Sequence, residues 1–185
     1  MKNIEQELKM LLNEREYNLL LADTDVKPQL QTNFYFRYKG MPKDVMIRLR
    51  RKGDEFVLCY KRRLSDTNGV TVCDERECEI AADFAESLCS RGIKRTEVLT
   101  LLGAEVPHNL TLVGHMDTYR AKFNVEQWTV ELDKNVYSGR VDYELECENL
   151  YVEQLEKLKN YLFYKYGVIF RPSKSKIQRF LEAYI

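Results

Sequence analysis

The chain has 185 residues, enough for a sizeable core, and we expect a single domain over residues 1–185. Its 29 basic and 29 acidic residues cancel, so the overall charge predicts no nucleic-acid or membrane partner, and what matters is where the charges lie. No apolar run is long enough to cross a bilayer and residues 1–9 are charged throughout, so we expect neither a membrane anchor nor a signal peptide.

The first stretch, residues 4–9 (IEQELK), is followed by apolar residues 10–12. If it is a strand, its alternation places Glu5, Glu7 and Lys9 on one face. One interpretation is a solvated edge, because an ordinary half-buried strand turns its charges to water. The other is a pair of carboxylates that share hard cations beside an ammonium that binds an anion. This stretch alone leaves both open.

A helix is predicted next, because Asn13 can act as its N-cap with Glu16 as the capping-box partner three residues later. The aromatic residues within 31–36 then favour a strand. Residues 45–52 and 55–64 form a predicted pair of antiparallel strands around the turn at residues 53–54.

Basic side chains form a row on each strand of this pair. Alternation sets Arg48, Arg50 and Lys52 on one face of the first strand, and Lys61 and Arg63 on one face of the second. Like charges across a ladder repel, so we expect something anionic between the rows. The alternative is an outer face that meets water.

Asn68-Gly69 is a strong hairpin signal, and the strand that follows, residues 70–80, places Glu75, Glu77 and Glu79 on one face. Residues 81–89 and 95–102 are predicted helices. They carry no functional motif, so we expect this insert to pack over one end or side of the sheet.

The second half is predicted to contain strands at residues 110–116, 119–125 and 127–137, with turns near Asp117 and Glu126. Arg120 and Lys122 share a face of the middle strand, and two acidic residues alternate with apolar ones in the next, Glu131 and Asp133. A further turn at residues 138–139 leads to a strand over residues 142–148. Four of its carboxylates share a face and are costly unless cations compensate them: Asp142, Glu144, Glu146 and Glu148.

Two amphipathic helices are predicted near the end, at residues 152–166 and within residues 172–184. Lys174, Lys176 and Arg179 on the second are interpreted either as a solvated face or as phosphate contacts. The first interpretation is at least as good as the second.

These elements predict an α+β fold. About eight or nine strands have charged faces, acidic on the first, fifth and last and basic on the third, fourth and a later one, while their reverse faces are apolar. An eight-stranded antiparallel β-barrel with a polar, charged interior and helices packed outside satisfies both facts. Such a barrel encloses space for one small ligand.

The five cysteines contain no CxxC pair, and their odd number and scattered spacing predict reduced thiols in a cytoplasmic protein: Cys59, Cys73, Cys78, Cys89 and Cys147. Because His108 and His115 are the only histidines, we expect hard cations on carboxylate oxygens rather than a Cys/His zinc site.

Residues 4–9 resemble the hExExK signature of the CYTH superfamily, the triphosphate tunnel metalloenzymes. Further motifs recur in the family's order: residues 31–36 (QTNFYF), 47–50 (IRLR), Lys61, 132–133 (LD) and 142–146 (DYELE). The ending at residues 171–180 (RPSKSKIQRF) resembles that of small stand-alone bacterial members. Arg37 is a departure, because an acidic residue is expected after the aromatic pair, and it puts detail at the tunnel mouth in doubt.

The resemblance implies an eight-stranded tunnel that binds a small-molecule triphosphate with Mg²⁺ or Mn²⁺. The residues implied to bind the substrate are Lys9, Arg48, Arg50, Lys61, Arg63, Arg120 and Lys122. The metal ligands would be Glu5, Glu7, Asp133, Glu144 and Glu146, with Glu77 as a further choice beside Asp133. The catalytic set would be Glu5, Glu7, Lys9 and Glu146.

Two classes of function follow. One is a metal-dependent phosphohydrolase acting on inorganic triphosphate or a small organic triphosphate. The other is a non-catalytic module that binds a nucleotide or polyphosphate in the same tunnel. A class IV adenylyl cyclase is a less favoured third, because the sequence shows no base pocket. The oligomeric state is left open.

Overall fold

The computed structural model describes residues 2–67, 70–148, 150 and 152–183, and the side chains of residues 2–6 and 152 are outside this description. Eight strands and five helices lie in these residues, in the order β1 (Lys2–Leu12), α1 (Glu14–Ala22), β2 (Gln29–Arg37), β3 (Val45–Lys52), β4 (Glu55–Thr67), β5 (Val70–Ile80), α2 (Ala82–Arg91), α3 (Arg95–Leu102), β6 (Thr111–Val125), β7 (Trp128–Tyr137), β8 (Arg140–Glu148), α4 (Val152–Tyr166) and α5 (Lys176–Ala183). The predicted turn at residues 68–69 lies outside the described residues.

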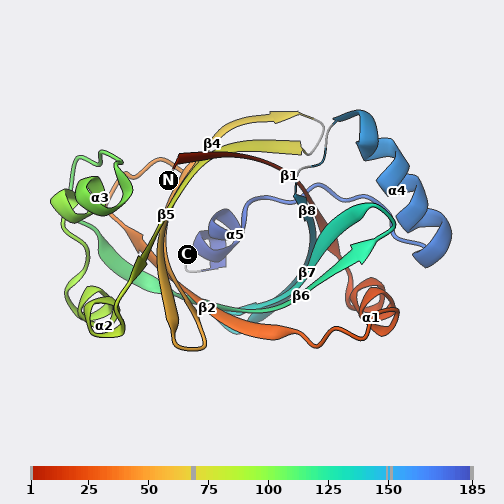
Figure 1. The fold of residues 1–185 in the computed structure, drawn as a ribbon, viewed down its shortest axis with the longest axis horizontal. Helices are drawn as coiled ribbons and strands as arrows, with labels where there is room; N and C mark the ends of the chain where they lie inside the picture. Colours follow the sequence, from red (N-terminus) through yellow and green to blue (C-terminus); the bar gives the residue numbers. More distant parts are fainter. Residues whose placement is uncertain (1, 68–69, 149, 151, 184–185) are drawn as a thin grey trace.

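All eight strands join in one closed antiparallel barrel with the order β1-β5-β4-β3-β2-β6-β7-β8 (Figure 1). β1 closes it, because it pairs with β5 on one side and with β8 on the other. Each of the eight strands therefore has a hydrogen-bonded neighbour on both sides. The predicted barrel fold is therefore confirmed.

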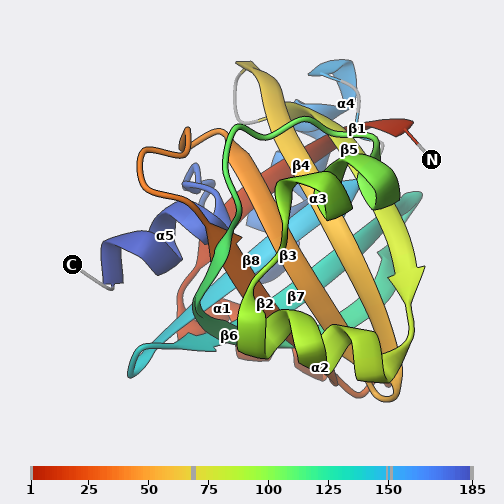
Figure 2. The same cartoon turned by 90° about the vertical axis from the view of Figure 1, so that its left-hand side faces the viewer.

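Two layers of helices cover opposite flanks of the barrel (Figure 1). α1 and α4 pack on the outer face of β1, β6, β7 and β8 through a cluster that includes Leu8, Leu132 and Leu158, all fully buried. α2 and α3 lie over β3, β4 and β5 on the other flank, as Figure 2 shows, around Leu58 and Leu88. Each buried leucine of this kind contributes about 1.5–3 kcal/mol. With the apolar outer face covered, the charged faces of β1, β3, β4, β5, β6, β7 and β8 are left for the interior.

Local sequence sets several element ends as predicted. Asn13 and Glu16 form the capping box of α1, in which the Asn13 side chain accepts from the Glu16 N–H at 2.8 Å. The β7–β8 turn places Ser138 at φ 47° and Gly139 at φ 71°, a pair of positive φ values that matches the twist of a tight hairpin. Glu126, also at positive φ, turns the chain between β6 and β7.

The predicted turn near Asp117 is wrong, because β6 continues through it for 15 residues. Asp117 is paired on both sides, with Thr32 of β2 and with Val136 of β7. Its carboxylate accepts a hydrogen bond from Thr32 Oγ1 at 2.7 Å, and neighbouring Thr118 donates to Asn135 at 2.8 Å. The polar side chains that suggested a turn therefore form hydrogen bonds to the neighbouring strands, and these bonds stabilise the extended strand.

α5 differs from the other helices because it lies across one end of the barrel. In Figure 1 it is seen in projection inside the ring of strands, and in Figure 2 it lies at the left-hand end. Ile177 and Phe180 pack there with Tyr35, Met46 and Tyr137. Among the described residues, every helix is too short or too polar to span a bilayer.

Candidate functional site

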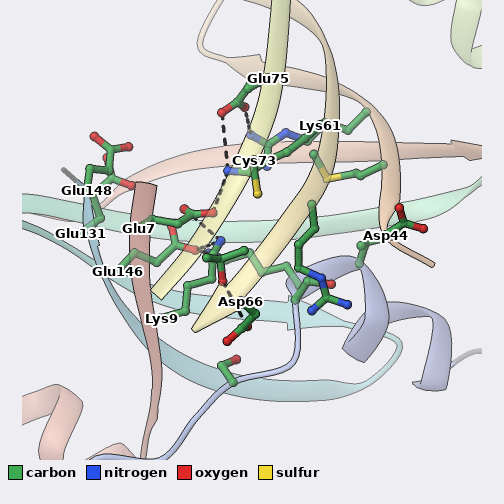
Figure 3. A pocket seen from close by; sticks show the side chains of 18 of the residues that line it. Glu7, Lys9, Asp44, Lys61, Asp66, Cys73, Glu75, Glu131, Glu146 and Glu148 are labelled. Carbon is green, nitrogen blue, oxygen red and sulfur yellow. Dashed lines mark hydrogen bonds and ion pairs between the residues drawn. The ribbon is translucent and has the colours of Figure 1, made fainter. Parts of the chain in front are cut away.

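The barrel interior holds a cavity of about 790 Å³ (Figure 3). Charged side chains from β1, β3, β4, β5, β6, β7 and β8 line it, together with Ser173, Ser175, Lys176 and Ile177 just before and within α5. The lining includes these predicted site residues: Glu7, Lys9, Arg48, Arg50, Lys61, Arg63, Glu77, Arg120, Lys122 and Glu146. The alternation of each strand therefore brings most of the predicted residues into one space.

One wall of the cavity, from β3 and β4, carries loosely paired cations. Arg48 lies 3.8 Å from Glu75 and Arg50 lies 3.9 Å from Glu77, both long for ion pairs. The Nε atoms of both arginines are buried and have no hydrogen-bond partner within the described part of the chain. Guanidinium groups in this condition have donors to offer to an anion. Arg63 is half-buried at the edge of this wall.

Glu7, on β1, connects this wall to the acids of β8 on the other side of β1. Its carboxylate lies 2.8 Å from the Lys61 ammonium and 3.2 Å from that of Lys9 (Figure 3). Lys9 in turn donates to Glu146 of β8 at 2.7 Å. Burial alone would lower the pKa of Lys9, but Glu146 and Glu7 raise it well above its usual value, so Lys9 stays charged. The side chain of Glu5 is outside the described residues, although its backbone pairs with Cys73.

The opposite wall, from β6, β7 and β8, carries tightly paired charges. Arg120 lies 2.6 Å from Asp133 and 2.8 Å from Glu146, and it also contacts Glu131. The acid row of β8, which is costly without compensation, is thus matched by cations in the structure. Lys122, half exposed at the rim, pairs with Glu131 at 2.9 Å.

Asp133, Glu144 and Glu146 form the candidate metal site. Each offers one carboxylate oxygen, and these oxygens lie within 4.8 Å of one another. All three residues are buried, and Asp133 and Glu144 are completely inaccessible. A donor set of carboxylate oxygens suits Mg²⁺ or Mn²⁺ rather than a soft metal, so these residues fit the predicted cations.

Electrostatics keep these acids ionised despite their burial. Burial alone would raise the pKa of Glu144, but Lys176 and Arg179 lower it to about 2. The pKa of Glu146 is likewise held well below its usual range by Lys176, Lys9 and Arg120, which outweigh burial. Two of these cations come from α5.

The interpretation of Lys176 and Arg179 as a solvated face is wrong. Only 7% of Lys176 and 9% of Arg179 is exposed, and both reach the acids of β7 and β8. Lys174, by contrast, is exposed and pairs with Glu182 at 2.8 Å. A signal was present in the sequence: Lys176 lies three residues before Arg179 and four before Phe180, so at helical spacing it neighbours both of them.

Arg37, the departure from the family pattern, has a structural role. Its guanidinium donates to the carbonyl oxygens of Val45 at 3.3 Å and Pro42 at 3.2 Å. It therefore holds the connection between β2 and β3 at the α5 end of the barrel, where an acid could not donate.

The model of the CYTH domain family matches residues 3–181 of the chain. Among solved structures, a candidate adenylate cyclase from Bacillus halodurans is 23% identical with a TM-score of 0.76, over 97% of this chain and 98% of that one. A candidate adenylyl cyclase from Hippeastrum, reported to have a dominant triphosphatase activity, is 24% identical with a TM-score of 0.78, over 96% and 95%. The PH1819 protein of Pyrococcus horikoshii is 21% identical with a TM-score of 0.64, over 96% and 98%. These likenesses show the fold, and no curated protein sequence matches the chain.

Proposed function

Because the chain belongs to the CYTH domain family, we propose that it is a divalent-metal-dependent triphosphatase acting on inorganic triphosphate or a small organic triphosphate. The observation that carries the proposal is a pair of loosely paired arginines, Arg48 and Arg50, which line one cavity together with Lys61 and with Glu146 of the carboxylate cluster. A triphosphate needs several cationic donors on one side and divalent metal on another. The reported triphosphatase activity of the Hippeastrum protein also supports hydrolysis.

The basic wall would bind the phosphate chain. Arg48 and Arg50 donate to phosphate oxygens through their guanidinium groups, and Lys61 acts as a point charge from the neighbouring strand. Arg63 and Lys122, at the edges of the cavity, would contact the two ends of the triphosphate. Lys9, Lys61 and Arg120 already have carboxylate partners at 2.7, 2.8 and 2.6 Å, so they would serve the phosphate only by sharing those contacts.

Mg²⁺ or Mn²⁺ would be held by Glu7, Asp133, Glu144 and Glu146. Glu5, two residues before Glu7, would be a further ligand. Such an ion neutralises phosphate charge and lowers the pKa of a bound water. Glu7 and Glu146, which contact Lys9 from both sides, are the proposed acceptors for the proton of the attacking water. Lys9 would keep these two carboxylates in place.

The test is the release of phosphate and of pyrophosphate from inorganic tripolyphosphate, thiamine triphosphate and ATP, with Mg²⁺ and Mn²⁺ compared. Multiple turnovers that release orthophosphate would support the proposal. Tight binding of all three compounds without turnover would instead identify a binding module. Pyrophosphate release from ATP with a cyclic product would identify a cyclase.

We also propose a cytoplasmic location. It is supported by the five cysteines, all of which are free thiols in the structure.

A further inference from the structure

An ammonium from α5 lies within the candidate metal site. Lys176 Nζ is 2.7 Å from Asp133 Oδ2, 3.0 Å from Glu144 Oε2 and 2.7 Å from Glu146 Oε1. These are the same three carboxylates whose oxygens cluster within 4.8 Å. A Mg²⁺ ion binds oxygen at about 2.0–2.1 Å and would need the same central position. The site therefore has room for one of the two cations.

Arg179 holds the same helix to the same acids. Its guanidinium lies 2.8 Å from Glu144 Oε2 and 2.9 Å from Asp142 Oδ2. It also donates to the backbone carbonyl of Lys174 and to the hydroxyl of Ser173, at the entrance to α5. Lys176 and Arg179 thus hold α5 against the barrel through carboxylates that a divalent metal would coordinate.

The rest of the attachment of α5 is limited to one end of the barrel. Phe180 contacts two aromatic rings there, Tyr35 at 4.8 Å and Tyr137 at 6.2 Å between ring centroids. The chain before α5 is anchored separately, because Arg171 pairs with Glu16 at 2.8 Å and its carbonyl accepts from the Leu11 N–H at 3.0 Å. Movement of α5 therefore need not disturb the strands or α1.

The cavity reaches this contact. Its lining includes Lys176 and Ile177 together with Ser173 and Ser175, so an ion that enters the barrel meets the α5 ammonium directly. A dication and an ammonium a few ångströms apart in a buried site repel strongly. If the metal ion and the Lys176 ammonium were both present, the same three carboxylates would have to coordinate the metal and pair with the ammonium at once.

We propose that α5 is a gate on the cation site: Lys176 fills the site in the ligand-free chain, and a divalent metal binds by displacing Lys176 and loosening α5. The inference rests on the proposed function, since the site is the one assigned to Mg²⁺ or Mn²⁺ there. The coupling is reciprocal, because whatever holds α5 closed weakens metal binding by the same factor. The gate therefore links loading of the metal to opening of one end of the barrel.

The first test removes the competing ammonium. Lys176→Met keeps a side chain of similar length without charge, and Lys174→Met is the matched control, an exposed lysine two residues away. Calorimetric titration of Mg²⁺ alone into each variant is expected to show at least tenfold tighter binding to Lys176→Met than to the wild type. Lys174→Met should bind as the wild type does. Unchanged or weaker binding to Lys176→Met would overturn the gate.

The second test uses the wild-type chain, so it does not depend on how the variant folds. Hydrogen–deuterium exchange is followed in the peptide that covers residues 176–183, with and without Mg²⁺ and in the absence of phosphate. Faster exchange with Mg²⁺ is expected, since the metal releases α5. Unchanged or slower exchange would mean that Lys176 is a fixed structural cation and would overturn the gate.

Failure of the gate is distinguishable from failure of the proposed function. Metal-dependent phosphate release by the wild type, together with unchanged exchange in α5, removes the gate and keeps the triphosphatase. Faster α5 exchange with Mg²⁺ in a protein that turns over no triphosphate keeps the gate and removes the enzyme.

Discussion

Replacement of Arg50 by alanine distinguishes a phosphate-binding wall from a solvated strand face. Arg50 is one-quarter exposed, and its partner Glu77, at 3.9 Å, is nearly half exposed. Because this ion pair is long and partly exposed to solvent, its loss costs at most about 1 kcal/mol of folding stability. The variant should therefore fold, which leaves ligand binding free to report on the role of the guanidinium.

The expected effect on binding is much larger. Truncating one partner of a desolvated charge pair typically costs about 2–5 kcal/mol, and about 1.4 kcal/mol is a tenfold change in affinity. Arg50→Ala should therefore weaken tripolyphosphate binding at least tenfold. The measurement is calorimetric titration of tripolyphosphate, with Ca²⁺ as the metal if Mg²⁺ supports turnover.

Arg51 supplies the matched control. It is the next residue on β3, but it is exposed, contacts the ring of Phe56 and donates to the carbonyl of Gly53 at 3.1 Å. Arg51→Ala removes the same charge from the outer face and should change affinity less than threefold, since exposed charges seldom contribute more than about 1 kcal/mol. Arg179 would be unsuitable as a control, because it is buried against Glu144. Equal, small losses in the two variants would refute the tunnel as the phosphate site.

Three further predictions concern a proposed catalytic carboxylate, a backbone contact and acid stability. Glu7→Gln should abolish metal-dependent phosphate release while circular dichroism stays that of the wild type, and unchanged turnover would contradict its assignment. Gly92→Ala should lower the free energy of unfolding by at least about 2 kcal/mol, because Gly92 has φ +82° and a Cβ there would lie 2.2 Å from the Leu110 carbonyl oxygen. Gly40→Ala has a similar φ with nothing within 4 Å, so urea unfolding of both variants should show the larger loss in Gly92→Ala. Burial would raise the pKa of Glu16, but hydrogen bonds from Arg171 and the Asn13 N–H lower it below its usual 4.5. Its contribution to stability is therefore present above about pH 4.5 and is lost as the pH falls further, by at most about 1.4 kcal/mol per pH unit, and Glu16→Gln should show a smaller loss between pH 6 and pH 3.

The period-two alternation of the sequence predicted the faces of the strands well. Arg48, Arg50 and Lys61 line the cavity because a strand leaves each side chain only two directions, and the apolar reverse faces required a cover of helices. Charges segregated on one face of most strands also predicted closure into a barrel. These inferences need only local spacing, which a sequence states directly.

Partners far apart in the chain could not be predicted in the same way. The turn expected at Asp117 is absent because Thr32, 85 residues away, pairs with that residue in the β2–β6 ladder and donates a hydrogen bond to its carboxylate. Arg179 meets Glu144 across 35 residues, and helical spacing says which face it lies on but not what that face meets. Ile177 and Phe180 indicate one buried stripe, and only the structure shows that the barrel end, with its acids, is what covers it.

The two walls of the cavity differ in how much of their charge is already used, and this difference has a consequence for how a triphosphate can enter. On the β6–β8 side, Arg120, Lys176 and Arg179 pair with acids at 2.6–2.9 Å. On the β3–β4 side, arginines lie 3.8–3.9 Å from their acids and keep free donors. An anion that binds only to the second wall still faces the carboxylates of the first across the barrel, which opposes it at short range. In the proposed triphosphatase, the phosphate chain would therefore be accommodated best when the carboxylate wall exchanges its lysine for a divalent ion, because the ion carries one more positive charge to the same position.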